Sequence, residues 1–544
     1  MGRIVCAGLS GLGLCGWAAF LGLTRRLAQP RLSHARLSAS ELPLAPVPDV
    51  VYSNRMLLAG GFWELAHRAW HIFFAIFAVV ISIVASAQVV LHKRDSRAAI
   101  AWVGFIWLVP LVGALLYFIF GVNRVRRQAA LLRAGLERYQ SHDSDAGCPP
   151  EELHRHLPGH TGHLHMLARV VNEIIERPLL PGNRIEPLVN GDAAYPAMLE
   201  AIAQARRTIS FETYIFDRDP IGLEFAHALG EALRRGVQVR VLIDAAGTRY
   251  SWPSILRTLR KEGLRYARFM PAFPLWRLMS LNLRTHRKIL VVDGKVGFTG
   301  GMNIREGHCL KRKPRRPVQD LHFRLTGPVV AQLQEAFADD WLFTTGEALR
   351  GEDWFPRPEP AGQVLARGIG DGPDEDFEKL RWVLLGALAI ARQSVRIVTP
   401  YFLPDPSILS AMNVAAMRGV RVDIVLCQRC NLPFVQWASR ALWWQVLEHG
   451  CHLWLTPPPF DHSKLMLVDG CWVLLGSANW DPRSLRLNFE YNVECYDQNL
   501  AQELNKIIQA KLHDAHEVTL DEADARGLIA RLRDGVARLA TPYL

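Results

Sequence analysis

Two long apolar segments lie in the N-terminal quarter of the chain. Residues 70–91 and 98–120 contain no Lys, Arg, Asp or Glu. At about 1.5 Å per helical residue, each is long enough to cross the roughly 30 Å hydrocarbon core of a bilayer. The short segment 92–97 between them suits a tight turn. The pattern therefore predicts an N-terminal transmembrane helical hairpin over residues 70–120.

A third apolar stretch, residues 4–23, precedes the hairpin. It fits a signal-like segment, a further span, or translated sequence upstream of a natural start at Met56. Residues 1–69 are expected to comprise this stretch and a linker containing Pro, Ser and Arg. Arginines lie outside both ends of the hairpin, which predicts that both flanks are cytoplasmic.

From residue 182 onward the chain carries the same pattern twice, which indicates an internal duplication. The β-rich run TISFETYIFD at 208–217 matches VRIVTPYFLP at 395–404, so that Tyr214 aligns with Tyr401. In each copy a helical stretch, a second strand and a long apolar strand follow, as in an α/β domain with a buried sheet. We expect two α/β halves packed about a pseudo-twofold axis.

The repeat sets the predicted domain boundaries. Residues 121–181 form a linker, residues 182–350 the first α/β half, and residues 351–544 the second half. A C-terminal helix over 520–540 is expected to close the second half through apolar positions at helical spacing. These positions are Leu528, Ile529, Leu532, Val536 and Leu539.

Two copies of the pattern His-x-Lys-x4-Asp fall at equivalent places in the duplication. They are His286, Lys288 and Asp293 in the first half, and His462, Lys464 and Asp469 in the second half. Alternation along a strand puts the His and the Lys of each copy on one face, pointing into a shared cleft. Each copy then ends in a turn of small residues followed by Asn303 or Asn479, whose amides are donors for an anion.

This arrangement fits a phosphodiester. Across a twofold axis, one imidazole attacks phosphorus to give a phosphohistidine, while the other protonates the leaving alkoxide and then deprotonates the incoming hydroxyl. Lys288, Lys464, Asn303 and Asn479 would stabilise charge on the non-bridging oxygens in place of a metal ion.

Composition and charge limit the class of partner. Of 544 residues, 50% are hydrophobic and 21% are charged, which excludes a wholly disordered chain. Lys and Arg number 63 against 52 Asp and Glu, giving a net charge of +11. This balance favours an anionic partner: nucleic acid, phospholipid headgroups or a phosphorylated substrate.

The motifs resemble those of the phospholipase D superfamily, and from about residue 70 to the C-terminus the chain resembles its bacterial cardiolipin synthase branch. The resemblance is carried by SRAAIAWVGFIWLVPLVGALLYFIFG, ETYIFDRDPIG, HRKILVVDG, DLHFRLTGPVV and PPPFDHSKLMLVDG. The Trp-Arg pair common in the family before its first acidic residue is replaced here by Val318 and Gln319. That departure concerns local lipid contacts and not the chemistry.

The resemblance implies a multi-pass protein of the bacterial inner membrane with a cytoplasmic catalytic domain and without a metal or other cofactor. It implies that His286 is the nucleophile and His462 the general acid and base. Asp320 and Glu490 occupy the places of the acidic residues that orient the histidines.

The superfamily also contains nucleases, so the motifs define the bond and not the molecule. The anchor and an apolar segment at 269–283 favour a phospholipid over nucleic acid, as do Trp437, Trp443 and Trp444, although these tryptophans also fit a core helix. The basic run at 311–316 suits anionic headgroups. We expect phosphatidyl transfer between two phosphatidylglycerol molecules to give cardiolipin and glycerol. The alternatives are a membrane-anchored phospholipase D-type hydrolase and a membrane-tethered nuclease.

Overall fold

A computed structural model describes residues 53–93, 96–121, 147–157, 159–250, 252–270, 283–373 and 376–541. The chain divides into two units, Met1–Val84 and Ala85–Leu544. The apolar stretch at 4–23 and most of the apolar segment at 269–283 lie outside the described residues.

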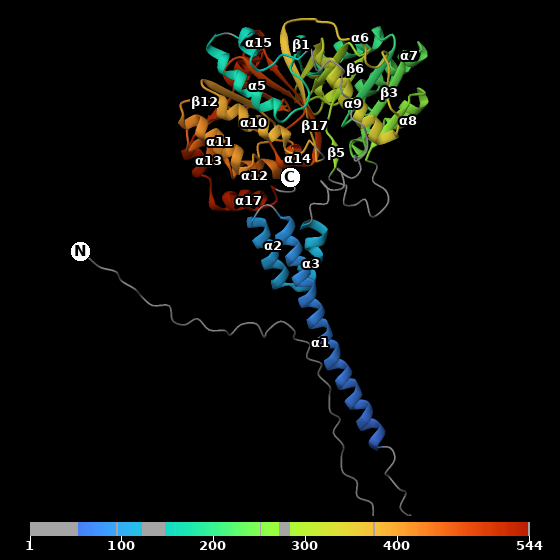
Figure 1. Ribbon diagram of the computed structural model, residues 1–544, viewed down its shortest axis with the longest axis vertical. Helices are drawn as coiled ribbons and strands as arrows, with labels where there is room; N and C mark the ends of the chain where they lie inside the picture. The colour runs from blue at the N-terminus through green and yellow to red at the C-terminus, as the bar shows by residue number, and fades with distance from the viewer. Residues whose placement is uncertain are drawn as a thin grey trace, which may run out of the picture. The chain divides into compact units, whose positions relative to one another are not determined.

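Helix α1 (Ser53–His92) contains the first predicted span (Figure 1). Its portion Leu65–His92 has a mean hydropathy of 2.6 over its most apolar window. These 28 residues extend about 42 Å along the helix axis, more than the hydrocarbon thickness of a bilayer. Among the described residues, α1 is the one helix long and apolar enough to cross a membrane.

The prediction of a continuous second span over 98–120 is wrong. The segment forms α2 (Ser96–Leu108), α3 (Pro110–Leu116) and a π-helical turn, Tyr117–Gly121. The helix breaks at Val109, because the residue before a proline is disfavoured in the helical region. The rings of Trp102 and Tyr117 lie 5.5 Å apart, whereas one straight helix would separate these positions by about 22 Å.

Helix α3 therefore folds back on α2. The two helices approach closely at Gly113, where a Cβ atom would lie 2.7 Å from the carbonyl oxygen of Phe105. The absence of a side chain at Gly113 is what permits this contact.

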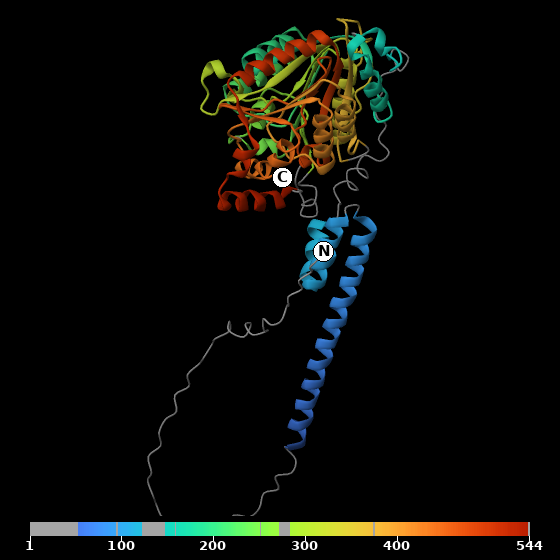
Figure 2. The ribbon, with the colours of Figure 1, turned by 90° about the vertical axis from the view of Figure 1, so that its left-hand side faces the viewer.

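The rest of the described chain forms a mixed α/β fold around one large sheet, with helices packed on both faces (Figures 1 and 2). The first-half strands are β1 (Leu180–Val189), β2 (Thr208–Thr213), β3 (Gln238–Asp244), β4 (Tyr266–Phe269), β6 (Ile289–Val292), β7 (Val296–Gly300) and β9 (Leu321–Thr326). The second-half strands are β10 (Val364–Asp371), β11 (Ser394–Val398), β12 (Arg421–Cys427), β13 (His452–Thr456), β15 (Leu465–Val468), β16 (Trp472–Gly476), β17 (Asn488–Tyr496) and β18 (His516–Val518).

The same strand pairings occur in both halves. Strand β2 lies between β3, which is parallel to it, and β6, which is antiparallel; β11 lies in the same way between β12 and β15. Antiparallel pairing then continues from β6 to β7 and β9, and from β15 to β16 and β17. The antiparallel pair β1–β10 joins the halves into one sheet.

Helices pack against the strands of both halves. The first half has α6 (Asn190–Gln204), α7 (Pro220–Arg234), α8 (Leu256–Lys261) and α9 (Val329–Thr345). The second half is covered by α5 (His165–Asn172), α10 (Lys379–Ile390), α11 (Pro406–Met417), α12 (Pro433–Arg440), α13 (Trp443–Leu447), α14 (Pro482–Arg486), α15 (Gln498–His513), α16 (Leu520–Asp524) and α17 (Leu528–Leu539).

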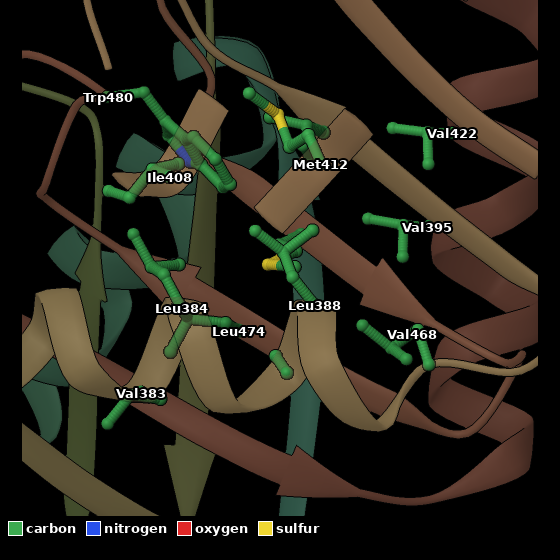
Figure 3. Close-up of a cluster of buried hydrophobic side chains, with 14 of the residues drawn as sticks. Val383, Leu384, Leu388, Val395, Ile408, Met412, Val422, Val468, Leu474 and Trp480 are labelled. Atoms are coloured by element: carbon green, nitrogen blue, oxygen red, sulfur yellow. The ribbon is translucent and has the colours of Figure 1, made fainter. Parts of the chain in front are cut away.

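Buried apolar side chains fix the strands that carry the motifs. In Figure 3, Leu384 and Leu388 of α10 and Met412 of α11 lie over Val395 and Val468 of the sheet. A second cluster, which contains residues of α9 and α15, draws on strands of both halves. Because closely packed cores resist displacement, the strand ends that leave these cores hold their polar residues in fixed positions.

The C-terminal helix does not close the second half in the predicted way. The segment forms two helices, α16 and α17, and the five apolar positions of α17 face solvent instead of the core. Its buried residues are Asp534 and Ala537. The five apolar positions share one face of α17, but this is the outer face of the helix.

Candidate active site

The two motif histidines meet although they are far apart in sequence. The ring centroids of His286 and His462 lie 6.5 Å apart, with an angle of 81° between the ring planes. The side chain of His286 is 10% exposed and that of His462 is 12% exposed.

Each histidine is held by backbone of the opposite half. The short strand β5 (Arg284–Thr285) pairs with β17, and the N–H of His286 donates to the carbonyl of Phe489 at 2.8 Å. In the second half, β14 (Phe460–Asp461) pairs with β8 (Val318–Gln319), and the N–H of His462 donates to the carbonyl of Gln319 at 2.8 Å. The pairing of the halves thus brings the two imidazoles together.

A carboxylate from the opposite half also binds each imidazole. His286 Nδ1 lies 3.0 Å from Glu490 Oε2, and His462 Nδ1 lies 2.9 Å from Asp320 Oδ2. A carboxylate at Nδ1 holds the ring proton there and leaves the lone pair of Nε2 available for chemistry. Both acidic residues named from the resemblance therefore reach a histidine.

The two motif lysines lie beside the histidines. Lys288 Nζ donates to the backbone carbonyl of His286 at 2.6 Å, and Lys464 Nζ donates to that of His462. Lys288 Nζ also lies 5.6 Å from the ring centroid of Tyr214. A buried ammonium pair of this kind favours binding of an anion between the halves.

Burial changes the ionisation of these groups. It lowers the pKa of Lys288 to about 7, with Glu490 opposing the shift and Lys464 adding to it. It lowers the pKa of Lys464 to about 8, against the attraction of Asp320. Burial likewise lowers the pKa of His286 and, with the two lysines nearby, holds that of His462 well below its usual value. Both imidazoles are therefore neutral at pH 7.

The two carboxylates ionise differently. Burial acts to raise the pKa of Glu490, but His286 and Lys288 more than offset it, so the pKa lies below its usual value. Burial raises the pKa of Asp320 to about 6, with Lys464 acting in the opposite direction.

The motif aspartates lie away from the imidazoles. Asp293 follows β6 at the end opposite His286 and accepts hydrogen bonds from the backbone N–H groups of residues 206–208. Asp469 does the same for the N–H groups of residues 392–394, and its Oδ2 also lies 2.7 Å from His163 Nε2. Both aspartates have positive φ, 51° and 50°, within the turns that end the two motifs.

The two asparagines are buried beside the site and are held by different partners. Asn303 Oδ1 accepts from the N–H of Ile215 at 3.0 Å, which fixes its amide plane. Asn479 Nδ2 donates to Ser484 Oγ at 3.2 Å. The amides are thus oriented by the loop that follows β2 and by helix α14.

Two tyrosines next to the histidines carried no predicted role. The ring of Tyr214 lies 5.3 Å from that of His286, and the ring of Tyr401 lies 6.4 Å from that of His462. Their alignment in the sequence repeat is the signal that identifies them, since a duplicated aromatic residue at the end of a strand lies beside each motif.

The predicted tryptophans differ in environment. Trp443 is buried, Trp437 is partly buried beneath the guanidinium of Arg533, and Trp444 is exposed. In the basic run at 311–316, the N–H of Lys311 donates to Asp192, and Arg312 lies 3.6 Å from Glu224.

Paired His-Lys motifs on such a fold define a phospholipase D-like enzyme. A family model described as "Cardiolipin synthase, PLD-like domain" matches residues 198–341 and 384–512, and one described as "Phospholipase_D-nuclease N-terminal" matches residues 74–121. Cardiolipin synthase of Geobacillus kaustophilus (strain HTA426) is 31% identical over 91% of this chain and 98% of its own length. Cardiolipin synthase A of Pseudomonas fluorescens (strain SBW25) is 31% identical over 85% of this chain and 95% of its own.

The chain belongs to this cardiolipin synthase family of phospholipase D-like phosphatidyltransferases. Among solved structures, phosphatidylserine synthase of Haemophilus influenzae Rd KW20 has the same fold, with a TM-score of 0.55 and 15% identity over 70% of this chain and 100% of that one.

Proposed function

We propose that this chain transfers a phosphatidyl group between two phosphatidylglycerol molecules, giving cardiolipin and glycerol. The observation that carries the proposal is the pair of imidazoles 6.5 Å apart, each bound at Nδ1 by a carboxylate. Two opposed imidazoles supply a nucleophile and a general acid on opposite sides of one phosphorus atom.

In the first step, His286 Nε2 attacks the phosphorus of the donor lipid. The P–N bond forms and the bond from phosphorus to the headgroup glycerol breaks, while the His462 imidazolium gives its proton to the leaving oxygen. The bound phosphodiester stabilises that imidazolium, because an anion nearby raises the pKa of a buried histidine.

In the second step, neutral His462 takes the proton from the terminal hydroxyl of a second phosphatidylglycerol. The alkoxide oxygen attacks phosphorus, the P–N bond breaks, and His286 is regenerated. The product is cardiolipin, and His462 is again protonated for the next cycle.

Four side chains are proposed to stabilise charge on the non-bridging oxygens: Lys288, Lys464, Asn303 and Asn479. The support is the burial of all four side chains and the low lysine pKa values, about 7 and 8. An entering phosphodiester raises both values and binds two ammonium groups that are already desolvated.

The four acidic residues act as positioning residues in this proposal. Glu490 and Asp320 orient the imidazoles, supported by their bonds to Nδ1. Asp293 and Asp469 hold the turns that follow the motif strands, supported by their backbone hydrogen bonds. The two halves would then act about a pseudo-twofold axis that passes between the imidazoles.

We place the enzyme at the bacterial inner membrane, anchored by α1, with its catalytic domain in the cytoplasm. The apolar length of α1 supports the anchor. The arginines at 124, 126, 127 and 133, which follow the N-terminal helices, support the orientation.

Labelled phosphatidylglycerol separates this function from its alternatives. Purified full-length enzyme in mixed micelles is expected to convert the label to cardiolipin with release of glycerol. Phosphatidic acid without cardiolipin would establish a hydrolase instead. Cleavage of single-stranded DNA with no change in the lipid would establish the nuclease.

A further inference from the structure

Helix α17 (Leu528–Leu539) turns its apolar residues away from the protein. Five large side chains on it are 60–85% exposed. They are Leu528 (72%), Ile529 (85%), Leu532 (60%), Val536 (62%) and Leu539 (80%). At 100° per residue they occupy one arc about 100° wide, which is the apolar face of an amphipathic helix.

The opposite face holds α17 against the protein through polar contacts. Asp534 is buried and pairs with Arg526 at 2.6 Å and with Arg533 at 2.8 Å. Arg526 also donates to the carbonyl of Arg440 at the end of α12, at 3.0 Å. Turning the helix over would bury its apolar arc but would break this network, so its orientation is fixed.

Arginines border the apolar arc on both sides. On a helical wheel, Arg533 lies just outside one edge of the apolar arc, and Arg531 and Arg538 lie outside the other edge. Within the described part of the chain, neither Arg531 nor Arg538 forms an ion pair. Arginines beside an exposed apolar stripe can extend toward lipid phosphates while the stripe enters the acyl region.

The helix also lies next to the edge of the candidate active site. Helix α17 packs on α12 (Figure 1), and the guanidinium of Arg533 lies 4.7 Å from the ring centroid of Trp437. The segment leading into α12 begins with Asn431, whose Oδ1 accepts from the hydroxyl of Tyr401 at 2.8 Å. The ring of Tyr401 is in turn 6.4 Å from that of His462.

Helix α12, on which α17 packs, also carries exposed apolar side chains at its start. Leu432, the residue before α12, and Phe434, the second residue of the helix, are both exposed. We propose that α17 and the start of α12 form a docking surface that lies on an anionic bilayer and brings the catalytic edge to the lipid headgroups. This contact is additional to the proposed anchor α1.

The side chains favour a lipid surface over a second copy of the chain. Seven exposed apolar residues are far fewer than the roughly 20–30 residues a side of a standard protein interface. In a symmetric dimer the arginines at the borders would also face one another. Anionic headgroups instead complement them, since each basic residue near such a surface is attracted to it.

A fluorophore on Ile529→Cys tests the contact. The full-length variant is reconstituted in vesicles of phosphatidylglycerol and phosphatidylcholine that contain a lipid carrying a quencher on its acyl chain. The expected result is strong quenching and a blue-shifted emission, because the label enters the apolar layer. The unsubstituted chain, treated with the same reagent, corrects for native thiols.

The matched control is Glu359→Cys, an exposed position. The Glu359 side chain is 77% exposed and pairs with Lys295 in the turn between β6 and β7, at the end of β6 opposite His286. A label there is expected to show no quenching. Equal quenching at both positions, or none at 529, would overturn the proposal. A disulfide-linked dimer through position 529 without lipid quenching would overturn it in favour of a second copy.

Two further variants separate this surface from the catalytic proposal. The double variant Arg531→Gln, Arg538→Gln, labelled at position 529, should show less quenching of the fluorophore in anionic vesicles. The expected level is that found in neutral phosphatidylcholine vesicles. His462→Ala should leave quenching unchanged, because docking needs no turnover. If the arginine substitutions leave quenching unchanged, the proposed role of anionic headgroups is wrong.

Discussion

The two halves present the same strands but place different acids beside their histidines. Glu490, which binds His286, accepts from Ser477 Oγ at 2.5 Å and from Asn488 Nδ2 at 3.1 Å. Asp320, which binds His462, accepts from the N–H of Leu321 at 2.8 Å. The first carboxylate has a lowered pKa, and the second has a pKa raised to about 6.

This difference fits a division of labour between the halves. A carboxylate that stays ionised stabilises the positive charge that His286 acquires when it is bonded to phosphorus. A carboxylate that titrates near neutrality holds His462 less strongly as imidazolium, which suits a group that must give up and regain a proton in every cycle. The residues that hydrogen-bond to Glu490 and to Asp320 thus fit His286 to act as nucleophile and His462 to act as general acid and base.

The largest expected effect comes from the histidines themselves. His286→Ala and His462→Ala should each lower kcat by about 10⁴-fold, because the two histidines act in one mechanism and loss of either one stops turnover. The difference lies in the intermediate: His462→Ala should still form an acid-labile phosphoenzyme, whereas His286→Ala should form none. The measurement is denaturation in alkaline detergent, which preserves the P–N bond, after reaction with a donor labelled with ³²P in its phosphate.

That experiment can reverse the assignment of the halves. A phosphoenzyme in His286→Ala and none in His462→Ala would make His462 the nucleophile. The double variant should show no phosphoenzyme and serves as the background.

The next largest effect on kcat is expected from replacing the two carboxylates, Glu490 and Asp320. Glu490→Gln should lower kcat by about 100-fold and Asp320→Asn by about 10-fold, in line with the range for groups that orient a reacting side chain. Glu490 has the larger effect because it is the acid expected to remain charged throughout the cycle. Circular dichroism and thermal unfolding of both variants check that each still folds. Equal losses would remove the proposed division of labour.

Much of this site is predictable from the sequence for a definite reason. The alternation of a strand puts His286 and Lys288 on one face, and a duplication places a second such pair at an equivalent position. The alternation of side chains along a strand does not predict that a carboxylate of the opposite half binds each imidazole. That contact depends on the pairings β5–β17 and β14–β8, which join segments far apart in the chain.

The two incorrect structural predictions have a common cause. Hydrophobic periodicity identifies an apolar face but not what lies against it. Residues 98–120 are apolar enough for a span, yet the break before Pro110 and the close contact at Gly113 fold them back. In α17, Asp534 forms ion pairs with the protein and turns the apolar arc outward. Both outcomes depend on tertiary contacts that override the local pattern.

The pH dependence of kcat/KM should also distinguish the lysines, which bind phosphate, from Asp320, which supports His462. The lysines must be protonated to bind phosphate, so kcat/KM should fall as pH rises through about 7 and 8, the values for Lys288 and Lys464. Toward acid, Asp320 takes up a proton as pH falls through about 6 and no longer supports His462. Asp320→Asn should abolish that acid limb and shift the alkaline limb to lower pH, because the Asp320 carboxylate acts to raise the pKa of both lysines. An unchanged acid limb in this variant would assign it to another group.

The smallest effect concerns the residue that most plainly distinguishes the halves. Ser477 follows Gly476 and bonds to Glu490, whereas its counterpart Gly301 lies where a Cβ atom would be 2.2 Å from Asp320 Oδ1. Ser477→Ala removes one hydrogen bond to a carboxylate that keeps its other contacts, so kcat should fall about fivefold, about 1 kcal/mol. Gly301→Ser offers the reciprocal change, but its side chain displaces Asp320 instead of binding it.

Steady-state kinetics with the phosphoenzyme assay distinguishes the two substitutions. Ser477→Ala should slow formation of the phosphoenzyme, because it weakens the acid behind the proposed nucleophile. Gly301→Ser should slow its breakdown, because it disturbs the acid behind the general base. If both variants slow the same step, Glu490 and Asp320 serve one histidine function jointly, and the contrast between the halves does not extend to the chemistry.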